Sequence, residues 1–500
     1  MNNKILKDNL PLSSVSYKEV FFWIGCCFTL VLSAFLVANE NYVVAALPFA
    51  MMVVAIALFS YQKLFYIIAF LAPLSIQLRF FMSAENDLSI PLEPFLVGVL
   101  LLTVYKLLFE PKIFNKKLLL HPISIVIYLN LMWLLITSAT STIPLVSFKF
   151  LLSRLWFLAA FYLMAMHLFT SKENAYRYFW FYIVSFIIVI SYATYQLNLS
   201  GLFDKQAANS SVVPLLPDHT SYGAIIALLI PFIIFFLTKK DYSFGQKSLI
   251  LIVLAVYIVG LIFSYTRAAW LSLGVAFAIF ILLLFKIKMR TLLVIIISIG
   301  LVVFLFWDNI IMSLEKNRQD SSNDLVEQLY SMTNISTDAS NLERINRWNC
   351  AIRMFQEKPI LGFGPATYMF QYAPYQISSE KTIISTNFGE VGNAHSEYLG
   401  ALAESGLLGA LSYLLILIAI TATAFKIYHR AKEREIRRLA MAIFLGLSTY
   451  FVHGFLNNFL DIDKFSLVFW GFAAFLVALD VFYLENQEFD SQNNRENHSQ

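Results

Sequence analysis

The side chains that could carry chemistry stand where long apolar stretches of the sequence end. Arg267 lies in such a place, in a turn between two apolar stretches. An arginine at this position can simply anchor a helix at the lipid headgroups. Its planar fork of donors also matches phosphate oxygens and stays charged at any relevant pH. We favour anion binding, because anchoring cations concentrate on the opposite, inner side of the predicted membrane.

His395 is the residue best suited to accept a proton. It precedes Ser396 and Glu397, which are typical of the start of a helix. The positive end of the helix dipole disfavours an imidazolium at this place, so the ring should be neutral. A histidine here could instead be an ordinary hydrogen-bonded residue at the interface. As the external histidine next to a helix start, it is our candidate general base.

Five further polar residues could support a site at the same boundary. Glu404 follows His395 by about two helical turns, and a carboxylate inside an apolar span must be partnered or neutral. Asp218 and His219 precede another apolar stretch, where either could cap a helix or take part in function. Lys149 and Arg154 lie near the outer end of a third stretch and are candidates for a phosphate cradle.

Several small residues follow His395 within one apolar stretch. They are Gly400, Ala401, Ser405, Gly406 and Gly409. Small residues let helix backbones approach closely in a membrane. The pattern therefore predicts close helix packing at this end of the stretch.

Other kinds of chemistry have no support in the sequence. The three cysteines, Cys26, Cys27 and Cys350, lack the spacing of a zinc site or a disulfide framework. Neither a Walker A loop, nor GxSxG, nor HExxH occurs. We therefore expect no metal, no cofactor and no nucleic acid partner, and a substrate that reaches the site from the membrane.

The elements that must position these residues are membrane-spanning helices. Hydrophobic residues make up 59% of the 500 residues and charged residues only 14%, with a mean hydropathy of +0.69. This composition predicts an all-α polytopic membrane protein with about 12 to 14 spans. We place the spans near 20–38, 43–60, 64–81, 94–109, 122–138, 148–169, 177–197, 221–237, 248–265, 268–285, 291–307, 397–425, 439–459 and 465–484.

The placement of lysine and arginine predicts the orientation of these spans. Alternate connections are rich in cations, most of all the connection that holds Lys426, Arg430, Lys432, Arg434, Arg437 and Arg438. Cytoplasmic loops carry such an excess. Both termini are therefore expected in the cytoplasm. Residues 308–395, Arg267 and the active site would then face the external side of the membrane.

Four regions follow from this organisation. Residues 1–307 should form a bundle of about 11 helices and residues 396–484 about three more. Between them, residues 308–395 form a long external loop, and residues 485–500 form a polar cytoplasmic tail. A connection as long as 308–395 is usually functional.

A helix is predicted within the long loop. Ser340 and Glu343 have the spacing of a capping box, and Pro359, Gly362 and Gly364 end the periodic stretch. One face of this helix is apolar and should dock on the membrane domain: Ile345, Trp348, Ile352 and Phe355. On the same wheel Arg344 falls beside this face, whereas Arg347 lies farther from it and Arg353 points away.

These residues together resemble the signature of the O-antigen ligase and polymerase superfamily. The segments are ERINRW at 343–348, KPILGFG at 358–364, NAHSEYL at 393–399 and AESGLLG at 403–409. Their order matches the family pattern RxxxW, PxxGxG, HxxYL and ExGxxG. The turn with Arg267 is similar to the arginine-bearing turn that the family places before its long loop.

The resemblance implies a metal-independent glycosyltransferase that works on a lipid-linked donor. Its members move a glycan from undecaprenyl pyrophosphate to an acceptor hydroxyl, which belongs to the lipid A core for a ligase and to another carrier-linked repeat unit for a polymerase. By motif, Arg267 and Arg344 would hold the pyrophosphate and His395 would serve the acceptor. Apart from the motif roles, Arg347 and Glu404 are candidate supporting residues. The motifs do not separate ligase from polymerase.

A transporter or flippase is the competing class, because the chain has so many predicted spans. Transporters usually place charged sites near the middle of the membrane. Here the charged residues gather at the outer boundary. That placement favours the enzyme.

The predicted topology can be tested by cysteine labelling. Residues 308–395 and Arg267 should be external, whereas Lys112, Lys239 and Arg434 should be cytoplasmic. In intact cells whose outer membrane has been opened, an impermeant reagent should label a cysteine placed at Asn323 and not one placed at Lys432. The reverse pattern would contradict the orientation.

Overall fold

The computed structural model describes most of the chain between residues 60 and 484. It describes residues 60–77, 89–285, 339–381, 385 and 392–484, and the single positions 24, 25, 28, 31, 32, 294, 298, 301 and 305. The chain divides into two compact units, Met1–Ile67 and Ile68–Gln500. The predicted spans 20–38, 43–60 and 291–307 lie almost wholly outside the described residues, as does most of 308–338. All contacts discussed below lie within the second unit.

The described part before the long loop is almost entirely helical. Its α-helices are α3 (Tyr61–Leu71), α4 (Leu92–Phe109), α5 (Lys116–Leu119), α6 (Pro122–Ala139), α7 (Pro144–Leu158), α8 (Ala165–Leu168), α9 (Lys172–Ser200), α10 (Lys205–Ala208), α11 (His219–Leu237), α12 (Phe244–Phe263) and α13 (Arg267–Leu284). Short 3-10 turns are η1 (Ala72–Leu74) and η3 (Pro111–Ile113), and a π-helical segment, η4 (Ala159–Met164), joins α7 to α8. Strands β1 (Ile76–Gln77) and β2 (Ser89–Ile90) pair antiparallel, with Ile76 opposite Ile90.

The described residues from 339 to 484 are mostly helical as well. They contain α17 (Ala339–Glu357), α18 (Tyr368–Gln371), the 3-10 turn η6 (Ala373–Tyr375), α19 (Glu397–Arg430), α20 (Arg434–His453), α21 (Asp463–Ala478) and the π-helical segment η7 (Leu479–Leu484). The helix predicted in the long loop is therefore present as α17. Its Ser340 side chain lies outside the described residues, so the capping box stays a prediction.

The prediction of an all-α polytopic membrane protein is confirmed. Among the described residues, nine helices are long and apolar enough to cross a membrane. They are Leu92–Phe109, Pro122–Ala139, Pro144–Leu168, Lys172–Ser200, His219–Leu237, Phe244–Phe263, Arg267–Leu284, Glu397–Arg430 and Asp463–Leu484. Most of the apolar stretches read from the sequence thus become helices where the structure describes them.

Two predicted spans have different bounds in the structure. The span predicted at 64–81 is wrong at its second half, because α3 ends at Leu71 and Pro73 lies in the turn that leads into β1. The span predicted at 439–459 is α20, which begins at Arg434 and ends at His453. Residues 454–462 instead form a loop, because Glu397 accepts hydrogen bonds from the backbone N–H groups of Phe459 and Leu460 at 2.9 and 3.0 Å.

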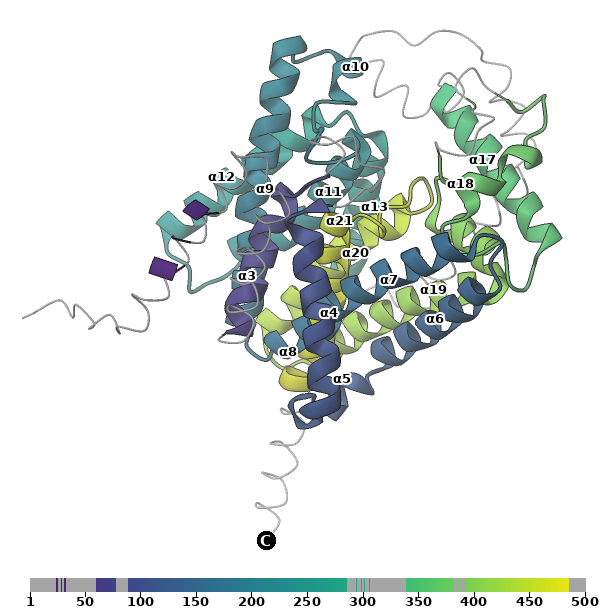
Figure 1. Cartoon of the computed structure of the whole chain (residues 1–500). Helices are drawn as coiled ribbons and strands as arrows, with labels where there is room; N and C mark the ends of the chain where they lie inside the picture. Colours follow the sequence, from purple (N-terminus) through teal and green to yellow (C-terminus); the bar gives the residue numbers. More distant parts are fainter. Residues whose placement is uncertain are drawn as a thin grey trace, which may run out of the picture. The chain divides into compact units, whose positions relative to one another are not determined.

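Helices α6, α7 and α19 lie side by side, and α17 of the long loop contacts α19 (Figure 1). The Asn130 amide of α6 donates to Ser412 of α19 at 2.9 Å, and the Trp133 indole N–H donates to the carbonyl of Ser405 at 2.8 Å. Both bonds cross between helices at polar positions within apolar sequence. They fix the register of α6 against α19.

Helix α19 is broken at Gly406. This residue has φ 67° and ψ −169°, a backbone conformation that is almost restricted to glycine. A break leaves carbonyl and N–H groups without their partners inside the helix, and in an apolar environment such groups must be satisfied elsewhere. The break therefore needs a second segment beside it.

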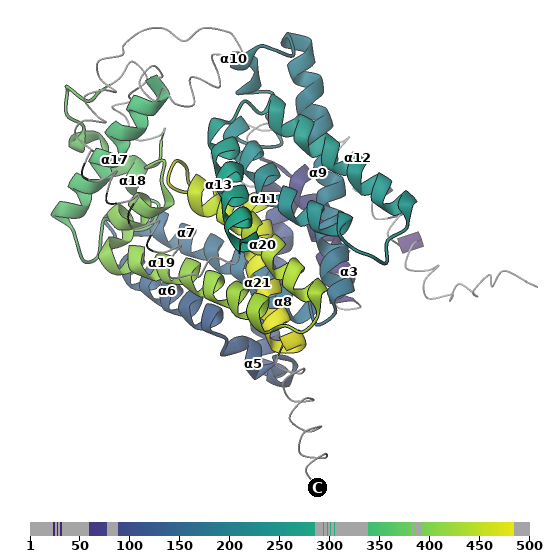
Figure 2. The same ribbon diagram turned by 180° about the vertical axis from the view of Figure 1, so that it is seen from behind.

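The segment 358–364, which follows α17, satisfies the groups that the break exposes. Phe363 donates its N–H to the carbonyl of Ala403 at 3.1 Å, and Gly364 donates to that of Glu404 at 2.8 Å. In return Leu407 donates its N–H to the carbonyl of Pro359 at 2.9 Å. The 358–364 segment thus replaces one turn of helix, and it ties α17 to α19 (Figure 2).

Glycine is required on both sides of this contact. A Cβ atom on Gly406 would lie 2.1 Å from the carbonyl oxygen of Ile360, and one on Gly362 would lie 2.4 Å from the Glu404 backbone. Backbone approach at this distance leaves no room for any side chain. The glycines of the PxxGxG and ExGxxG patterns are therefore the two halves of one contact.

Replacement of Gly406 by alanine should destabilise the protein. The strained backbone alone should cost roughly 1–3 kcal/mol, and the clash with Ile360 adds to it. We expect a lower midpoint of thermal unfolding in detergent or nanodiscs. Gly274→Ala is the matched control, since its Cβ would meet nothing within 4 Å and its helix is regular. Equal midpoints for the two variants would contradict the account of the break.

Candidate functional site

Helix α17 packs through the face that carries Arg347, Cys350 and Met354. Cys350, Ala351 and Met354 are fully buried, in one cluster with Tyr368, Tyr372 and Ala403. The predicted docking face is wrong in this respect, since Ile352 remains 39% exposed. Residues 366–381 wrap around α17 and bury the face that looked polar. A helical wheel cannot predict this burial, because it considers only the residues of the helix itself.

Arg347 is a buried structural residue, which corrects its predicted place away from the packed face. Its Nε donates to Glu343 at 2.6 Å, and its guanidinium stacks on the ring of Tyr372 at 4.1 Å. A Cβ on Gly392 would lie 1.9 Å from Arg347 Nη1, so the chain passes directly over this guanidinium. Arg347 therefore holds the segment before His395 against α17.

His395 is held in a strained turn between α17 and α19. Its φ is 48°, its N–H donates to Asn393 Oδ1 at 2.9 Å, and its carbonyl accepts the indole N–H of Trp348 at 3.4 Å. Ser396 then caps α19 by accepting the N–H of Leu399. Such left-handed backbone in a residue other than glycine persists only where surrounding contacts fix it. The backbone of His395 is thus held between α17, through Trp348, and the capped start of α19.

Two arginines act on His395. Burial, the larger cause, and the positive charges of Arg344 and Arg347 together lower the pKa of His395 to about 4, and the carboxylates of Glu343 and Asp218 oppose this shift. The predicted neutral imidazole therefore has a stronger cause than the helix dipole. A ring with this pKa is neutral at ambient pH and can accept a proton, although only as a weak base while the site is empty.

The positive charge of Arg344 acts on three histidines. Besides His395, it acts electrostatically on His219, the first residue of α11, and on His453, the last residue of α20. The Nδ1 atoms of His219 and His453 are buried and have no hydrogen-bond partner among the described residues. These two nitrogen atoms are therefore available to form hydrogen bonds with a ligand. Sequence analysis did not single out His453, whose only signal was its place at the end of a predicted span.

The turn with Arg267 lies against the same helix end. Thr266 Oγ1 donates to the carbonyl of His219 at 2.9 Å, and Gly223 leaves the space that Thr266 fills. Arg267, which begins α13, is half-buried next to this contact. The structure therefore brings the turn that carries Arg267 to the start of α11, beside His219.

A separate cavity of about 460 Å³ lies on the other side of the segment 393–396. Asn393, Ala394 and Ser396 line it, whereas His395, Arg344 and Arg267 do not. Its charged lining residues are Arg154, Asp218, Glu397, Glu404 and Asp461. Gly400, Ala401, Ser405 and Gly409 also line it, so the small residues of α19 leave space as well as allowing helix packing.

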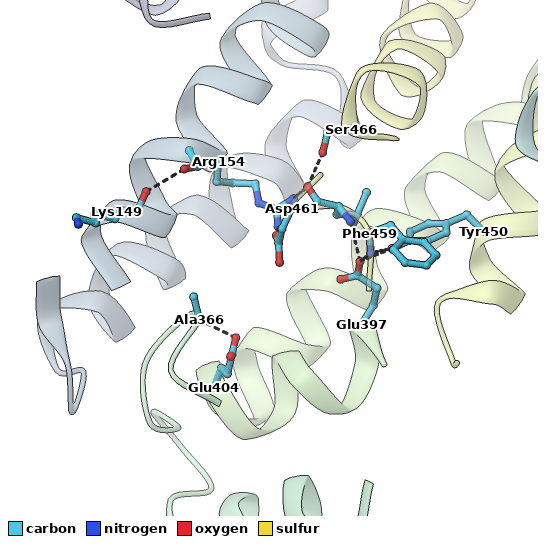
Figure 3. A network of polar contacts seen from close by, with 11 residues as sticks. Lys149, Arg154, Ala366, Glu397, Glu404, Tyr450, Phe459, Asp461 and Ser466 are labelled. Atoms are coloured by element: carbon cyan, nitrogen blue, oxygen red, sulfur yellow. Dashed lines mark hydrogen bonds and ion pairs between the residues drawn. The ribbon is translucent and has the colours of Figure 1, made fainter. Parts of the chain in front are cut away.

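Four of these charged residues hold the cavity walls: Arg154, Asp461, Glu404 and Glu397, whose contacts are described below (Figure 3). Arg154 donates to Asp461 Oδ1 at 2.7 Å and to the carbonyl of Leu460 at 3.2 Å. Glu404 accepts the backbone N–H groups of Ala366 and Tyr368 at 2.9 and 3.0 Å. Glu404 is therefore partnered, as predicted.

The remaining candidates divide between helix capping and solvent exposure. Asp218 caps α11 by accepting the N–H groups of Thr220 and Ser221 at 2.7 and 2.8 Å. Lys149 is exposed and does not line the cavity. The phosphate cradle predicted from Lys149 and Arg154 stays a prediction, and Arg154 is paired with Asp461.

Sequence reasoning missed the role of Glu397. Its Oε1 accepts hydrogen bonds from the Tyr450 hydroxyl and from the N–H groups of Phe459 and Leu460. A glutamate in the first turn of a helix is so common that its sequence signal suggests only a helix start. Here it joins α19, α20 and the loop before α21.

Comparison with known proteins agrees with the motifs. Residues 250–414 match the sequence profile of the family described as O-antigen ligase. The matched region contains Arg267, Arg344, His395 and Glu404, and the recognition of the O-antigen ligase and polymerase superfamily is thereby confirmed. No curated protein matches the chain.

The buried place of Arg347 predicts a loss of stability on substitution by lysine. Arg347→Lys removes the planar stack on Tyr372 and the short Nε contact with Glu343, which together should cost roughly 1–3 kcal/mol. The thermal unfolding midpoint should fall. Arg434→Lys, at an exposed position of α20, should leave it unchanged. An unchanged midpoint for Arg347→Lys would contradict the structural role.

Proposed function

We propose that this multi-pass membrane protein, whose residues 250–414 carry the O-antigen ligase family region, is an O-antigen ligase. It would move a glycan from undecaprenyl pyrophosphate to a hydroxyl of the lipid A core at the periplasmic face of the inner membrane. Both termini would then lie in the cytoplasm. At the level of the family, the chain is a glycan-transferring membrane enzyme.

The observation that carries the proposal is the position of Arg344 among His395, His219 and His453. A pyrophosphate next to Arg344 would pair with its guanidinium and could satisfy the buried imidazole nitrogens of His219 and His453. Arg267, on the turn bonded to His219, would add a second cation. Buried polar atoms without partners are costly, so a site that leaves them open favours a ligand that fills it.

The reaction needs a group that takes a proton. The acceptor oxygen attacks the anomeric carbon, the bond from that carbon to the pyrophosphate breaks, and the hydroxyl proton must leave. His395 is neutral and can take this proton. When the negatively charged donor binds beside Arg344, it should offset the positive field and raise the pKa of His395. His395 would then become a stronger base only when the donor is in place.

The reaction also needs stabilisation of the departing undecaprenyl pyrophosphate. Fixed guanidinium groups stabilise charge on a leaving group without reorganising during the reaction. We assign this role to Arg344 and Arg267, so the reaction would require no metal ion. The passage of Gly392 over the Arg347 guanidinium and the bond from Trp348 to the His395 carbonyl join α17 to the His395 turn, which would fix the distance between base and leaving group.

Deletion of the gene, followed by analysis of envelope glycans, tests the proposal. A strain without the ligase should retain full-length glycan on its lipid carrier and lose it from the lipid A core. A strain that instead attaches single repeat units to the core would identify the chain as a polymerase. Unchanged glycans on both carrier and core would contradict both activities.

Substitution of His395 and of Arg344 should affect different steps. His395→Ala should lower the transfer rate roughly a hundredfold to ten-thousandfold while donor binding remains, because the base is lost. Arg344→Ala should weaken donor binding as well, by roughly ten- to a hundredfold, because a charge-assisted contact is lost. Purified variants with carrier-linked donor and acceptor allow donor affinity and turnover to be measured separately. Wild-type turnover by His395→Ala would exclude the base assignment.

The pH dependence of the same reaction provides an independent readout. An essential base must be neutral, so kcat/KM should fall as pH falls through the pKa of His395, near 4 in the free enzyme. Without the positive charge of Arg344 this pKa should rise. The residual activity of Arg344→Ala should therefore be lost at a higher pH than that of the wild type. If kcat/KM falls at the same acidic pH in both proteins, the group that titrates is not His395.

A further inference from the structure

The cavity of about 460 Å³ beside the His395 turn has no role in donor binding as proposed above. Three consecutive positions around the turn divide between the two sites: Ala394 and Ser396 line the cavity, whereas His395 does not. A volume of this size falls in the ordinary range of small-ligand sites. The cavity therefore borders the turn that carries His395 without including the His395 side chain.

The charge of the cavity disfavours a phosphate group. Arg154 is the single cation among the residues that line it, and Asp461 already pairs with it at 2.7 Å. Three further carboxylates, those of Asp218, Glu397 and Glu404, line the same space. An anion would meet these carboxyl groups without a free cation to compensate its charge. An uncharged ligand with hydrogen-bond donors is favoured instead.

Hydrogen-bond acceptors remain available on these carboxylates. Asp218 is bonded through Oδ1, Asp461 through Oδ1 and Glu397 through Oε1. The second oxygen of each accepts no hydrogen bond from the described residues. Figure 3 shows Asp461 and Glu397 directed toward the space between α7 and α19. Hydroxyl groups of a ligand could donate to these oxygens.

Trp470 of α21 supplies the complementary donor. It lines the cavity and is only 2% exposed, yet its indole N–H has no acceptor among the described residues. A buried indole N–H usually finds a partner, and here the protein does not provide one. Phe150, Tyr413 and Tyr368 add aromatic surface to the same lining. Acceptors, a donor and aromatic rings around one space suit a polyhydroxylated ring.

We propose that this cavity binds an uncharged sugar at the acceptor end, with Trp470 Nε1 donating to a sugar oxygen and the carboxylates accepting from sugar hydroxyls. The proposal rests on the proposed function, because it assigns the acceptor to one side of the His395 turn and the donor pyrophosphate to the other. A hydroxyl of a sugar held between Asn393 and Ser396 would approach the base from the side opposite Arg344. The cavity would thus determine which hydroxyl is glycosylated.

Trp470→Phe tests the donor while it keeps an aromatic ring. Loss of one hydrogen bond should raise the KM for the acceptor roughly two- to tenfold. The KM for the donor should stay unchanged. Trp156→Phe is the matched control, since its indole N–H is also buried without a partner but Trp156 does not line the cavity. A rise in the donor KM of Trp470→Phe would overturn the assignment.

Ala401→Leu tests the space itself. Ala401 lines the cavity, so a larger side chain there should exclude the acceptor and lower transfer, whereas donor binding should remain. Ala410→Leu, on the same helix but away from the cavity, should transfer normally. Equal acceptor KM values in wild type, Trp470→Phe and Ala401→Leu would overturn the proposal even if the wild type is an active glycosyltransferase.

Direct binding separates the failure of this proposal from the failure of the proposed function. The full-length protein in nanodiscs should bind free oligosaccharide released from the lipid A core, and Ala401→Leu should abolish binding. Glycan released from the lipid carrier serves as the second probe, and preference for it would identify a polymerase acceptor in the same cavity. Binding of either probe without transfer would refute the proposed function alone. No binding of either probe to a wild type that transfers would refute the cavity as the acceptor site.

Discussion

The break in α19 at Gly406 is the constraint on which the site depends. A helix that opens inside an apolar environment must find partners for its freed backbone groups. Here Phe363 and Gly364, in the chain after α17, donate to carbonyls of α19, and Leu407 of α19 donates to the carbonyl of Pro359. Glu404, in the last turn before the break, then holds the following residues through Ala366 and Tyr368. The irregular turn of α19 at Gly406 thereby fixes the position of residues 359–368, which lie about 40 positions earlier in the sequence.

The same contact explains why the polar residues divide into two sites. The chain that leaves the break wraps α17 and buries Arg347, and the chain that returns passes over this guanidinium at Gly392 before it reaches His395. Arg344 acts on the histidines, whereas Glu397, Glu404 and Asp461 line the cavity together with Arg154. Ala394 and Ser396 line this cavity and His395 does not. For a transfer reaction this arrangement would keep an anionic leaving group and a hydroxylated acceptor apart until both meet at His395.

Sequence periodicity alone could not give the packing of α17. A helical wheel ranks side chains by apolar character, and it therefore chose Ile345, Trp348, Ile352 and Phe355 over Arg347 and Cys350. The choice failed because Arg347 is buried with its own partners: Glu343 neutralises its charge and the ring of Tyr372 covers its guanidinium plane. Tyr372 arrives from a segment whose path no local pattern predicts. Likewise the loop after His453 looked apolar enough to continue α20, and only the hydrogen bonds from Phe459 and Leu460 to Glu397 show why it does not.

The sequence by itself determined the class of the protein, most of its described membrane helices, the helix within the long loop and the motif residues Arg267, Arg344, His395 and Glu404. These features are local, because apolar length, charge at helix ends and glycine spacing can be read within a few turns of chain. The tertiary structure alone decided that the glycines at 362 and 406 face each other, that Arg154 pairs with Asp461 and that Trp470 lines a cavity with Glu397. Those relations join residues up to some hundreds of positions apart. Their distances depend on how the helices pack, which is a property of the whole fold and not of any one segment.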